Sequence, residues 1–352
     1  MARAETVARV HLLQADARRV GALLQLGSVS GELSFASHDI ALAEPGNAFL
    51  ATALLPSMLA ATRLEVDAPV SPRLLAALPE IMQLVHGWDP RYRPIRIHVE
   101  SERLLARDDG RGVACFFSGG IDSFHSVLQN LDRLSALVFI HGFDIPLGDG
   151  LVRQRVAAGL RSAARELGKP LIEVETNARE LLEQFAPWTA LHGAVLASVA
   201  LLLGQAFREM IIPATHPLAQ LRPHGSHPWL DPLWSSEAVK IVHHGAEVDR
   251  IGRITAIAGS GVVQRWVRVC WRNTGGTYNC GACVKCLQAL AGFREAGALG
   301  RLRSFPAGSL RAVRLRAFAK NLLSSEERDP AFGPRSLGVN DPTWASRRQR
   351  PA

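Results

Sequence analysis

The feature that most constrains the fold is an alternation of short apolar runs with helical segments between residues 113 and 215. The apolar runs are "VACFF", "ALVFIHGF", "PLIEVETN" and "EMIIPAT", and segments with helical periodicity separate them. Short apolar strands joined through helices are typical of a parallel sheet that is covered on both faces. We therefore predict an α/β, Rossmann-like fold with a doubly wound parallel sheet, whose ligands lie at the carboxyl ends of the strands.

The sequence pattern divides the chain into three parts. Residues 1–105 mix strand-like and helical segments, which predicts an N-terminal α+β domain. Within it, Ser71 before Pro72 predicts a helix start, because serine is a favoured N-cap and proline suits the first turn. Residues 106–300 are predicted to form the second domain, and residues 301–352 a basic helical segment with a disordered tail.

The loop "SGGIDS" lies where the first strand of the second domain meets a helix. The N–H groups of a helix start and the helix dipole together favour an anion such as phosphate. Gly119 and Gly120 let the backbone approach phosphate oxygens, while Ser118 and Ser123 offer hydroxyl groups. Asp122 is suited to magnesium, which prefers one or two carboxylates together with phosphate oxygens. The loop is not a Walker A motif, and a capped helix after a tight turn is the alternative interpretation.

The formal net charge of +8 is concentrated near the carboxyl-terminal end. Residues 301–352 hold 11 Lys or Arg against 4 Asp or Glu, whereas the first 300 residues hold 29 against 28. The tail is therefore predicted to be a solvated helix followed by a disordered end, with contact with RNA or a phosphate-rich partner as the alternative, and no basic stripe is predicted across the main domains. The apolar run at 193–204 is shorter than the roughly 20 residues that cross a bilayer, and no apolar signal core is present. We expect a cytoplasmic protein without membrane contact.

Four of the five cysteines lie in one short segment, where Cys270 precedes a C-x2-C-x2-C motif of Cys280, Cys283 and Cys286. Two-residue gaps let successive thiolates converge on one ion, and a cysteine at a strand end completes a tetrahedral set. The stretch "VRVCW", which contains Cys270, is predicted to be that last strand. Four soft ligands leave no open position, which predicts a structural zinc in a small lobe at residues 266–290. Redox thiols and unliganded core cysteines are the alternatives.

The order Ser-Gly-Gly-Ile-Asp-Ser matches the SGGxDS signature of the PP-loop ATP pyrophosphatases, so the chain resembles this family of the HUP-like, adenine nucleotide alpha-hydrolase-like superfamily. In that family the loop binds the pyrophosphate part of ATP, and the enzyme transfers AMP to a substrate oxygen. The resemblance implies a nucleotide site with adenosine near the backbone of the second strand, around Phe139 and Ile140. The residues that it assigns to ATP and magnesium are Ser118, Gly119, Gly120, Ile121, Asp122, Ser123, Ile140 and Asp144, with Asp122, Ser118 and Ser123 taking part in catalysis.

The loop and the cysteines together, over roughly residues 110–295, resemble the 7-cyano-7-deazaguanine synthase family, which combines SGGxDS with a distal cysteine and C-x2-C-x2-C for zinc. Those enzymes activate a carboxylate with ATP and convert it with ammonia to an amide and then a nitrile. The resemblance implies an adenylating ligase with a small-molecule substrate, an ammonia or amine donor, and ATP, Mg²⁺ and Zn²⁺ as cofactors. The N-terminal 105 residues and the basic extension depart from that family's usual chain. A tRNA-modifying PP-loop enzyme, with zinc or an iron–sulfur cluster, and a non-catalytic ATP sensor are the alternatives.

Several histidines lie in the irregular stretch that follows the fourth apolar run. His224 and His227 show the one ligand-like spacing among them, and we expect structural or substrate-facing roles rather than a second metal site. His192 opens an apolar helix near a strand end, where it can contact either the helix start or a substrate.

Overall fold

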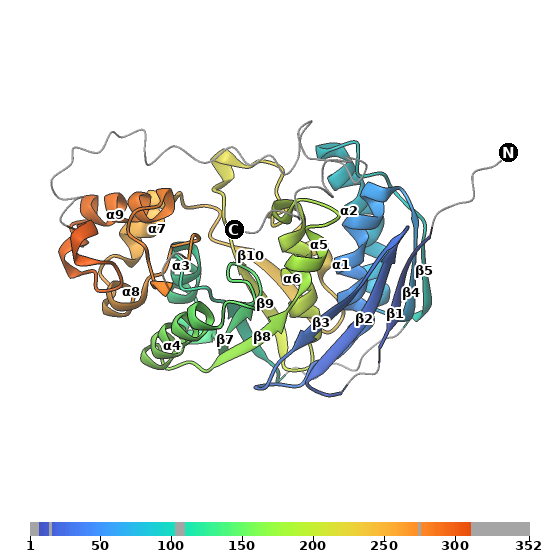
Figure 1. Ribbon diagram of the computed structural model, residues 1–352, viewed down its shortest axis with the longest axis horizontal. Coiled ribbons are helices and arrows are strands. Elements are labelled where there is room, and N and C mark those ends of the chain that lie inside the picture. Colours follow the sequence, from blue (N-terminus) through green and yellow to red (C-terminus); the bar gives the residue numbers. More distant parts are fainter. Residues whose placement is uncertain (1–6, 14–15, 103–109, 274–275, 311–352) are drawn as a thin grey trace.

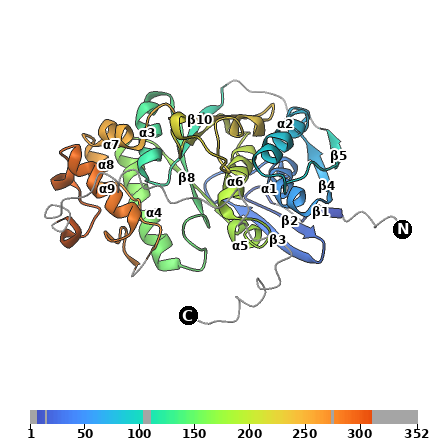
Figure 2. The ribbon, with the colours of Figure 1, turned by 90° about the horizontal axis from the view of Figure 1, so that it is seen from above.

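The computed structural model of the chain describes residues 7–13, 16–102, 110–273 and 276–310. Its centre is one ten-stranded sheet with helices against both faces (Figures 1 and 2). The predicted domain boundary near residue 105 and residues 311–352 of the predicted basic tail lie outside the described residues. In the part of the chain that is described, no helix is both long and apolar enough to span a membrane.

The strands are β1 (Val7–Leu12), β2 (Arg19–Leu26), β3 (Val29–Ala36), β4 (Arg63–Val70), β5 (Ile97–Glu102), β6 (Gly112–Phe116), β7 (Ala136–His141), β8 (Leu171–Thr176), β9 (Phe207–Pro213) and β10 (Lys240–His244). The α-helices are α1 (Pro45–Ala60), α2 (Pro72–Trp88), α3 (Ile121–Gln129), α4 (Gly150–Glu166), α5 (Ala178–Leu182), α6 (Trp188–Leu202), α7 (Arg250–Ile257), α8 (Gly261–Trp266) and α9 (Val284–Glu295). Short 3-10 helices are η1 (Leu131–Arg133), η2 (Leu218–Gln220), η3 (Asp231–Trp234) and η5 (Leu299–Arg301).

The strand order is β10-β9-β6-β7-β8-β3-β2-β1-β4-β5. Neighbours from β10 to β8 are parallel, those from β8 to β1 are antiparallel, and β1, β4 and β5 are parallel again. In the first of these groups the chain runs from β6 outward to β7 and β8, and then returns to β9 and β10 on the other side of β6. The order therefore reverses between β6 and β9, the place where open α/β sheets bind their ligands. The predicted α/β class with a mostly parallel sheet is confirmed.

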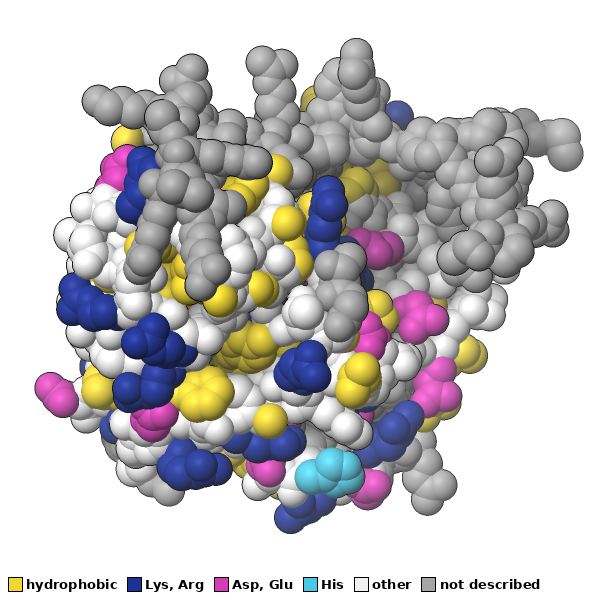
Figure 3. Space-filling model, turned by 60° about the vertical axis from the view of Figure 1, so that its left-hand side comes forward, with side chains coloured by type: hydrophobic (Ala, Val, Ile, Leu, Met, Phe, Trp, Pro, Cys, Tyr) yellow, Lys and Arg dark blue, Asp and Glu magenta, His cyan; other side chains and the backbone are white. Residues whose placement is uncertain are grey.

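The central strands are buried on both faces, as their apolar sequences predict. Every residue of β7 is buried. Phe116 and Val138 belong to the core that the sheet shares with α1, α2, α5 and α6, whereas Cys115 and Leu137 belong to the core under α3, α4, α7, α8 and α9. The helices of the second core gather at one end of the molecule (Figure 2), and Figure 3 shows the face on that side. The sheet is thus enclosed between two hydrophobic cores.

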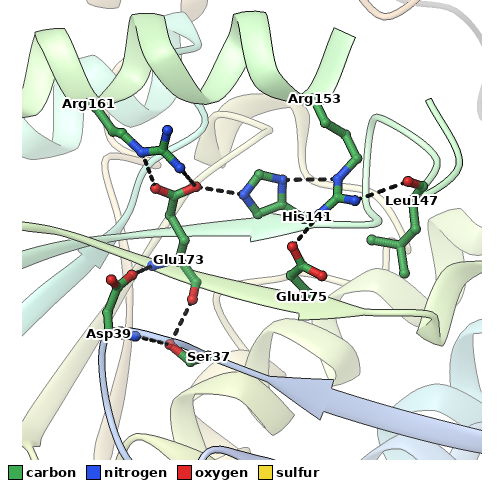
Figure 4. Close-up of polar contacts among 8 residues, drawn as sticks. All are labelled: Ser37, Asp39, His141, Leu147, Arg153, Arg161, Glu173 and Glu175. Atoms are coloured by element: carbon green, nitrogen blue, oxygen red, sulfur yellow. Dashed lines mark hydrogen bonds and ion pairs between the residues drawn. The ribbon is translucent and has the colours of Figure 1, made fainter. Parts of the chain in front are cut away.

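The N-terminal strands continue the same sheet, because β3 pairs with β8 through Phe35 and Ala36. Side chains extend this short ladder (Figure 4). Ser37 Oγ donates to the carbonyl oxygen of Glu173 (2.7 Å), and Asp39 Oδ2 accepts the N–H of Glu173 (2.7 Å). Helix α1 also packs against α6. The segment that the sequence analysis assigned to an N-terminal domain therefore shares a sheet and a core with the parallel strands.

The carboxylate of Glu173 organises a second part of this junction, toward α4 (Figure 4). It accepts Arg161 Nε–H (2.5 Å) and lies 2.8 Å from His141 Nε2. Arg153 adds an ion pair with Glu175. Burial raises the pKa of Glu173, but the hydrogen bonds from His141 and Arg161 outweigh it, and the pKa falls below its ordinary value of 4.5.

The structure differs from the predicted elements at three strands. The predicted strand "VRVCW" is wrong, since the backbone N–H groups of Val269 and Cys270 donate to Asn279 Oδ1 (2.9 and 3.2 Å) and not to a neighbouring strand. Strand β10 was not predicted, because the two histidines of "KIVHH" weaken its apolar pattern. Strand β2 was also missed, since "RVGALLQL" is rich in leucine and poor in β-branched residues. Pairing with β1 and β3 on either side makes it a strand.

The predicted helix start at Ser71 is confirmed. Helix α2 begins at Pro72, and Ser71 Oγ accepts the N–H of Leu74 (3.1 Å). The same hydroxyl donates to Glu237 Oε2 (2.5 Å), while Glu237 Oε1 accepts the N–H of Arg73 (2.7 Å). A carboxylate far away in the sequence thus completes the cap, at the helix end where the dipole favours negative charge.

Candidate functional site

A cavity of about 240 Å³ lies at the carboxyl ends of β6, β7 and β9, where the strand order reverses. Its walls are the loop between β6 and α3, strand β7 with the loop after it, and the first turns of α6. The predicted site residues that line it are Ser118, Gly120, Asp122, Ser123, Ile140 and Asp144. The cavity also includes Phe143, Trp188 and Arg268, to which the sequence analysis gave no role.

The loop between β6 and α3 turns at Gly119, whose φ of +74° favours glycine. A Cβ there would lie 2.6 Å from Leu160 Cδ2, so the Leu160 side chain of α4 would also have to shift. Gly120 is the N-cap of α3, and Ser123 Oγ donates to its carbonyl oxygen (3.0 Å). Ile121 is buried in the core and anchors the helix start. The first N–H groups of α3 lack intrahelical acceptors, and Asp122 and Ser123 of this first turn line the cavity.

The Asp122 carboxylate lies against two arginines of α7. Arg253 Nη1 is 2.6 Å from Oδ1, and Arg250 Nη1 is 3.3 Å from Oδ2. Arg253 is only 1% exposed, and it also donates to the carbonyl oxygens of Ala214 (2.6 Å) and Gly245 (3.0 Å), directly after β9 and β10. One buried guanidinium therefore ties the start of α3 to two strand ends. Sequence reasoning missed Arg253, because a single arginine in a short helix carries no pattern.

Arg268 closes another side of the cavity. Its backbone N–H donates to the carbonyl oxygen of Gly119 (2.8 Å), and Arg268 is one of the residues that line the cavity. Arg268 Nη2 donates to Asn273 Oδ1 (2.5 Å), and Asn273 Nδ2 donates to the carbonyl oxygen of Asp144 (2.8 Å). The glycine loop, the loop after β7 and the segment before Cys270 are thus joined by hydrogen bonds around one guanidinium.

The apolar wall of the cavity includes aromatic rings. Phe143 and Trp188 meet edge to face, with ring centroids 4.9 Å apart. Arg179 lies 5.5 Å from the Trp188 ring centroid and donates to the carbonyl oxygen of Phe143 (2.7 Å), which fixes both rings. Ile140 adds an aliphatic surface from β7. The cavity therefore offers apolar surface that suits a flat ring, in addition to the N–H groups that suit an anion.

Histidines extend from the cavity into the loop before β10. The His192 ring lines the cavity and packs against His224 (centroids 4.5 Å apart), which in turn packs against His216 (4.9 Å). Among the described residues, no metal-binding arrangement of His, Cys, Asp or Glu includes these rings. His192 is the histidine that is placed to meet a bound molecule.

Asp231 organises the far end of the same loop. It is fully buried, accepts Ser226 Oγ–H (2.7 Å) and the N–H of His227 (3.2 Å), and lies 2.7 Å from His243 Nδ1. Burial, together with the charge of nearby His243, lowers the pKa of His227 to about 4. His227 is therefore neutral at physiological pH.

The four cysteines that were predicted to bind a metal lie together. The Sγ atoms of Cys270, Cys280, Cys283 and Cys286 are all within 4.8 Å of one another, and those of Cys280 and Cys286 are 3.9 Å apart. Gly281, with φ of +68°, turns the chain between the first two cysteines of the motif. The cluster can hold a metal ion such as zinc.

Asn279 brings the distant Cys270 to the other three cysteines. The Asn279 side chain is buried, accepts the N–H of Cys270, and donates to the carbonyl oxygens of Val267 (2.9 Å) and Ser304 (3.0 Å). It therefore substitutes for the strand pairing that the sequence analysis expected here. The asparagine beside Cys280 was a visible signal, because its amide can bond two backbone groups at once.

Three of the four thiols have shifted pKa values. Burial raises the pKa of Cys283 and of Cys286. Burial acts on Cys280 too, but the N–H groups of Ala282 and Cys283 outweigh it and lower the pKa of Cys280 to about 7. Cys280 is thus ionised more readily than Cys283 and Cys286 to the thiolate, the form that binds metals.

No protein-family model matches the chain, and comparisons with curated proteins and with solved structures likewise find no match. Function must therefore be inferred from the geometry and chemistry of the site.

Proposed function

We propose that the protein is an ATP-dependent adenylating enzyme, which converts ATP to AMP and pyrophosphate while it activates a carboxylate or similar oxygen of a small molecule for attack by ammonia or another nitrogen nucleophile. The observation that carries this proposal is the cavity at the reversal of strand order, bounded by the glycine loop at the start of α3. The resemblance of the loop to the PP-loop ATP pyrophosphatases of the HUP-like superfamily, and of the loop and cysteines to the 7-cyano-7-deazaguanine synthase family, supports the same reaction.

In this proposal the loop binds the phosphates and β7 binds the base. The free N–H groups of α3 and the hydroxyls of Ser118 and Ser123 face the phosphate oxygens, while Phe139 and Ile140 pack against adenine. Phe143, Trp188 and His192 are left for the small molecule, next to the α-phosphate. The site works mainly by holding the two reactants in line and by stabilising negative charge.

The chemistry balances in two steps. A carboxylate oxygen of the substrate attacks the α-phosphorus, the bond to the bridging oxygen breaks, and pyrophosphate leaves with that electron pair. Ammonia then attacks the acyl carbon, AMP leaves with the carboxylate oxygen and the electron pair of the broken C–O bond, the nitrogen loses one proton, and an amide remains. One ATP is consumed for each C–N bond formed.

Magnesium, when bound, supplies positive charge to the phosphate oxygens, and Asp122 is the residue proposed to hold it. Of its two carboxylate oxygens, Oδ1 is bound at 2.6 Å by the buried Arg253. Oδ2 has the longer contact, 3.3 Å to the partly exposed Arg250. We therefore assign Oδ2 to the magnesium side and Oδ1 to the arginine side.

The decisive experiment follows the products of labelled ATP. The protein is incubated with ATP, Mg²⁺, ammonium and a panel of small carboxylic acids, and AMP and pyrophosphate are quantified. We expect equal amounts of both, dependent on one class of acid, and a loss of at least tenfold in Ser118→Ala with Ser162→Ala as the matched control. If the protein binds ATP but forms no AMP under any of these conditions, the proposed enzymatic activity is refuted and the protein is an ATP sensor instead.

We also propose that the cysteine cluster holds zinc. A tetrahedral ion with metal–sulfur bonds of about 2.3 Å has sulfur–sulfur distances of about 3.8 Å, close to the 3.9 Å between Cys280 and Cys286. Thiolates that bind separate irons of a cluster lie farther apart. We expect one zinc per chain by elemental analysis, its loss in Cys283→Ser, and its retention in Cys115→Ala, because Cys115 lies in β6 away from the cluster. Iron with sulfide instead of zinc would refute the assignment. Reduced thiols of this kind fit the cytoplasm, which we propose as the location.

A second candidate, a tRNA-modifying enzyme with the same ATP chemistry, is favoured by the charge of residues 250–310, which include the cysteine cluster. This segment contains nine Lys or Arg and one Glu. Lys285, Arg301 and Arg303 of this segment are exposed, and the face on that side of the molecule shows many Lys and Arg side chains around hydrophobic patches (Figure 3). Charge of this kind attracts phosphate backbones.

Salt dependence separates the two candidates. A tRNA-modifying enzyme should bind tRNA with an affinity that falls steeply as the salt concentration rises. Changing Lys285, Arg301 and Arg303 together to Gln should make the slope of log affinity against log salt shallower, by an amount that corresponds to up to about three charges. AMP formation should then depend on RNA. AMP formation with a small acid alone, together with no change of RNA binding in the triple variant, would exclude the second candidate.

A further inference from the structure

Two buried arginines, Arg253 and Arg268, lie beside the glycine loop, and they differ in whether a carboxylate is paired with them. Arg253 is paired with the carboxylate of Asp122. Arg268 is 5% exposed, yet in the described parts of the chain no carboxylate forms an ion pair with it. Its Nη2 donates to the neutral amide of Asn273, and its Nε is buried without an acceptor among the described residues. Arg268 is therefore a buried cation that has no counter-charge among the residues that the structure describes.

A buried charge without a partner is costly, so such groups are normally paired. Arg268 lines the cavity, together with Ser118 and Gly120. Its backbone N–H donates to the carbonyl oxygen of Gly119 (2.8 Å), so the backbone that carries Arg268 and the glycine loop keep a fixed relation. An anion bound at the start of α3 supplies the missing counter-charge, and phosphate fits the planar donor fork of arginine.

We infer that Arg268 is a phosphate-binding residue of the cavity and that the cysteine cluster positions it; this rests on the proposed ATP site. Arg268 precedes Cys270 by two residues. The intervening backbone is held by Asn279, which accepts the N–H of Val269 (2.9 Å). Tyr278 OH, in turn, donates to the carbonyl oxygen of Trp266 (2.8 Å).

The segment that carries Arg268 is thus clamped between the cysteine motif and the glycine loop. Asn279 joins two segments of the chain, the one that carries Cys270 and the one that carries the C-x2-C-x2-C cysteines. A metal bound by all four thiols would hold these two segments together. Loading of the cluster therefore raises the affinity of the cavity for phosphate, while the apolar wall around Ile140 and Trp188, which belongs to β7 and α6, keeps its shape.

The first test compares Arg268→Met with Arg272→Met, which removes an exposed cation that stacks on Trp271 four residues farther along the chain. Binding of ATP, inorganic pyrophosphate and adenosine is measured by calorimetry on the metal-loaded protein. We expect Arg268→Met to weaken the binding of ATP and of pyrophosphate about 10- to 100-fold, the usual range for a lost charge-assisted hydrogen bond. The affinity for adenosine should not change. Arg268→Lys should recover part of the loss, and Arg272→Met should bind all three ligands like the wild type.

The second test removes the metal with a chelator and, separately, by Cys280→Ser. Both changes should weaken the binding of pyrophosphate but not that of adenosine. Combining either of them with Arg268→Met should produce little further loss of pyrophosphate affinity. Adenosine binding serves as the check that the cavity is still folded.

The outcomes separate the inference from the proposed function. If the wild-type protein binds neither ATP nor pyrophosphate, the proposed function itself fails. If it binds both and Arg268→Met binds them equally well, or loses adenosine to the same extent, the role of Arg268 is refuted. If Arg268→Met is selective but metal removal leaves pyrophosphate binding intact, the positioning by the cysteine cluster is refuted.

Discussion

Gly119 and Gly120 are neighbours in the glycine loop, but different constraints act on them. Gly119 has φ of +74°, and a Cβ there would require Leu160 to shift, whereas Gly120 has φ of −73° and the nearest neighbour of a Cβ would be the flexible Ser118 hydroxyl at 3.3 Å. We expect Gly119→Ala to lower the free energy of unfolding by about 2 kcal/mol and Gly120→Ala by less than about 1 kcal/mol. Urea unfolding followed by tryptophan fluorescence measures both, and equal losses would show that the turn is not strained.

Arg253 and Arg250 both contact Asp122, but only one of them is buried. Arg253→Met removes a fully buried cation and leaves the carbonyl oxygens of Ala214 and Gly245 without their donor, so we expect a loss of about 3–5 kcal/mol in the free energy of unfolding. Arg250→Met, which removes a partly exposed partner, should cost at most about 1 kcal/mol. Denaturation curves of the two variants decide this; similar values would mean that Arg253 does not hold the strand ends together.

At the scale of elements, the start of helix α2 shows how much one capping residue contributes to stability. Ser71→Ala removes the N-cap and also the contact with Glu237, so we expect the free energy of unfolding to fall by about 1–2 kcal/mol. Ser162→Ala, in the middle of α4 with its hydroxyl on the helix surface, should change it by less than about 0.5 kcal/mol. Thermal and urea unfolding provide the comparison, and an unchanged Ser71→Ala protein would contradict the capping role.

The elements that were predicted correctly have strong local patterns. Strand β7 is a continuous apolar run, and α2 has a cap, a first-turn proline and an apolar face, so each is specified by its own residues. Strands β2 and β10 and the segment at Val267–Cys270 lack such a pattern. Their state depends on the strand or side chain that lies beside them, which a local pattern does not contain.

At the scale of the whole molecule, buried histidines predict how stability responds to acid. The pKa of His227 is lowered to about 4, from an ordinary value of 6.5, by burial and then by the charge of His243. The unfolded chain therefore takes up a proton between pH 6.5 and 4 that the folded chain does not, so stability is full above pH 6.5 and falls as the pH drops through this window. His125 and His244, whose pKa values are also lowered chiefly by burial, act in the same direction.

The contribution of His227 to this loss is up to about 3 kcal/mol. It is measured by urea unfolding at several pH values between 7.5 and 4.5 for the wild type, His227→Asn and the exposed-site control His98→Asn. We expect the slope of stability against pH to decrease in His227→Asn and to stay the same in the control. Equal slopes in all three proteins would show that His227 is protonated in the fold. Below about pH 4.5, Glu173, whose pKa is lowered by His141 and Arg161, adds a further loss as its carboxylate becomes protonated.

The way in which the two halves of the sheet join also belongs to this scale. The strands before residue 105 carry their own alternation of apolar and polar residues, which predicts strands and helices but does not indicate what lies at the sheet edge. Two residue pairs between β3 and β8, and the bonds of Ser37 and Asp39 to Glu173, join them to the parallel strands. No residue of this junction stands out in the sequence.

The sequence by itself determined the parts whose chemistry is local: the apolar strands of the parallel sheet, the turn and helix start at "SGGIDS", the cap at Ser71, and the three cysteines of the C-x2-C-x2-C motif. The tertiary structure decided which distant groups complete them. It placed Ile140 and Asp144 around the same cavity as the glycine loop, and it brought Arg268 to that cavity. The physical reason is that backbone conformation depends mostly on nearby residues, whereas a buried charge or amide takes its partner from whichever segment the packing of the cores brings beside it.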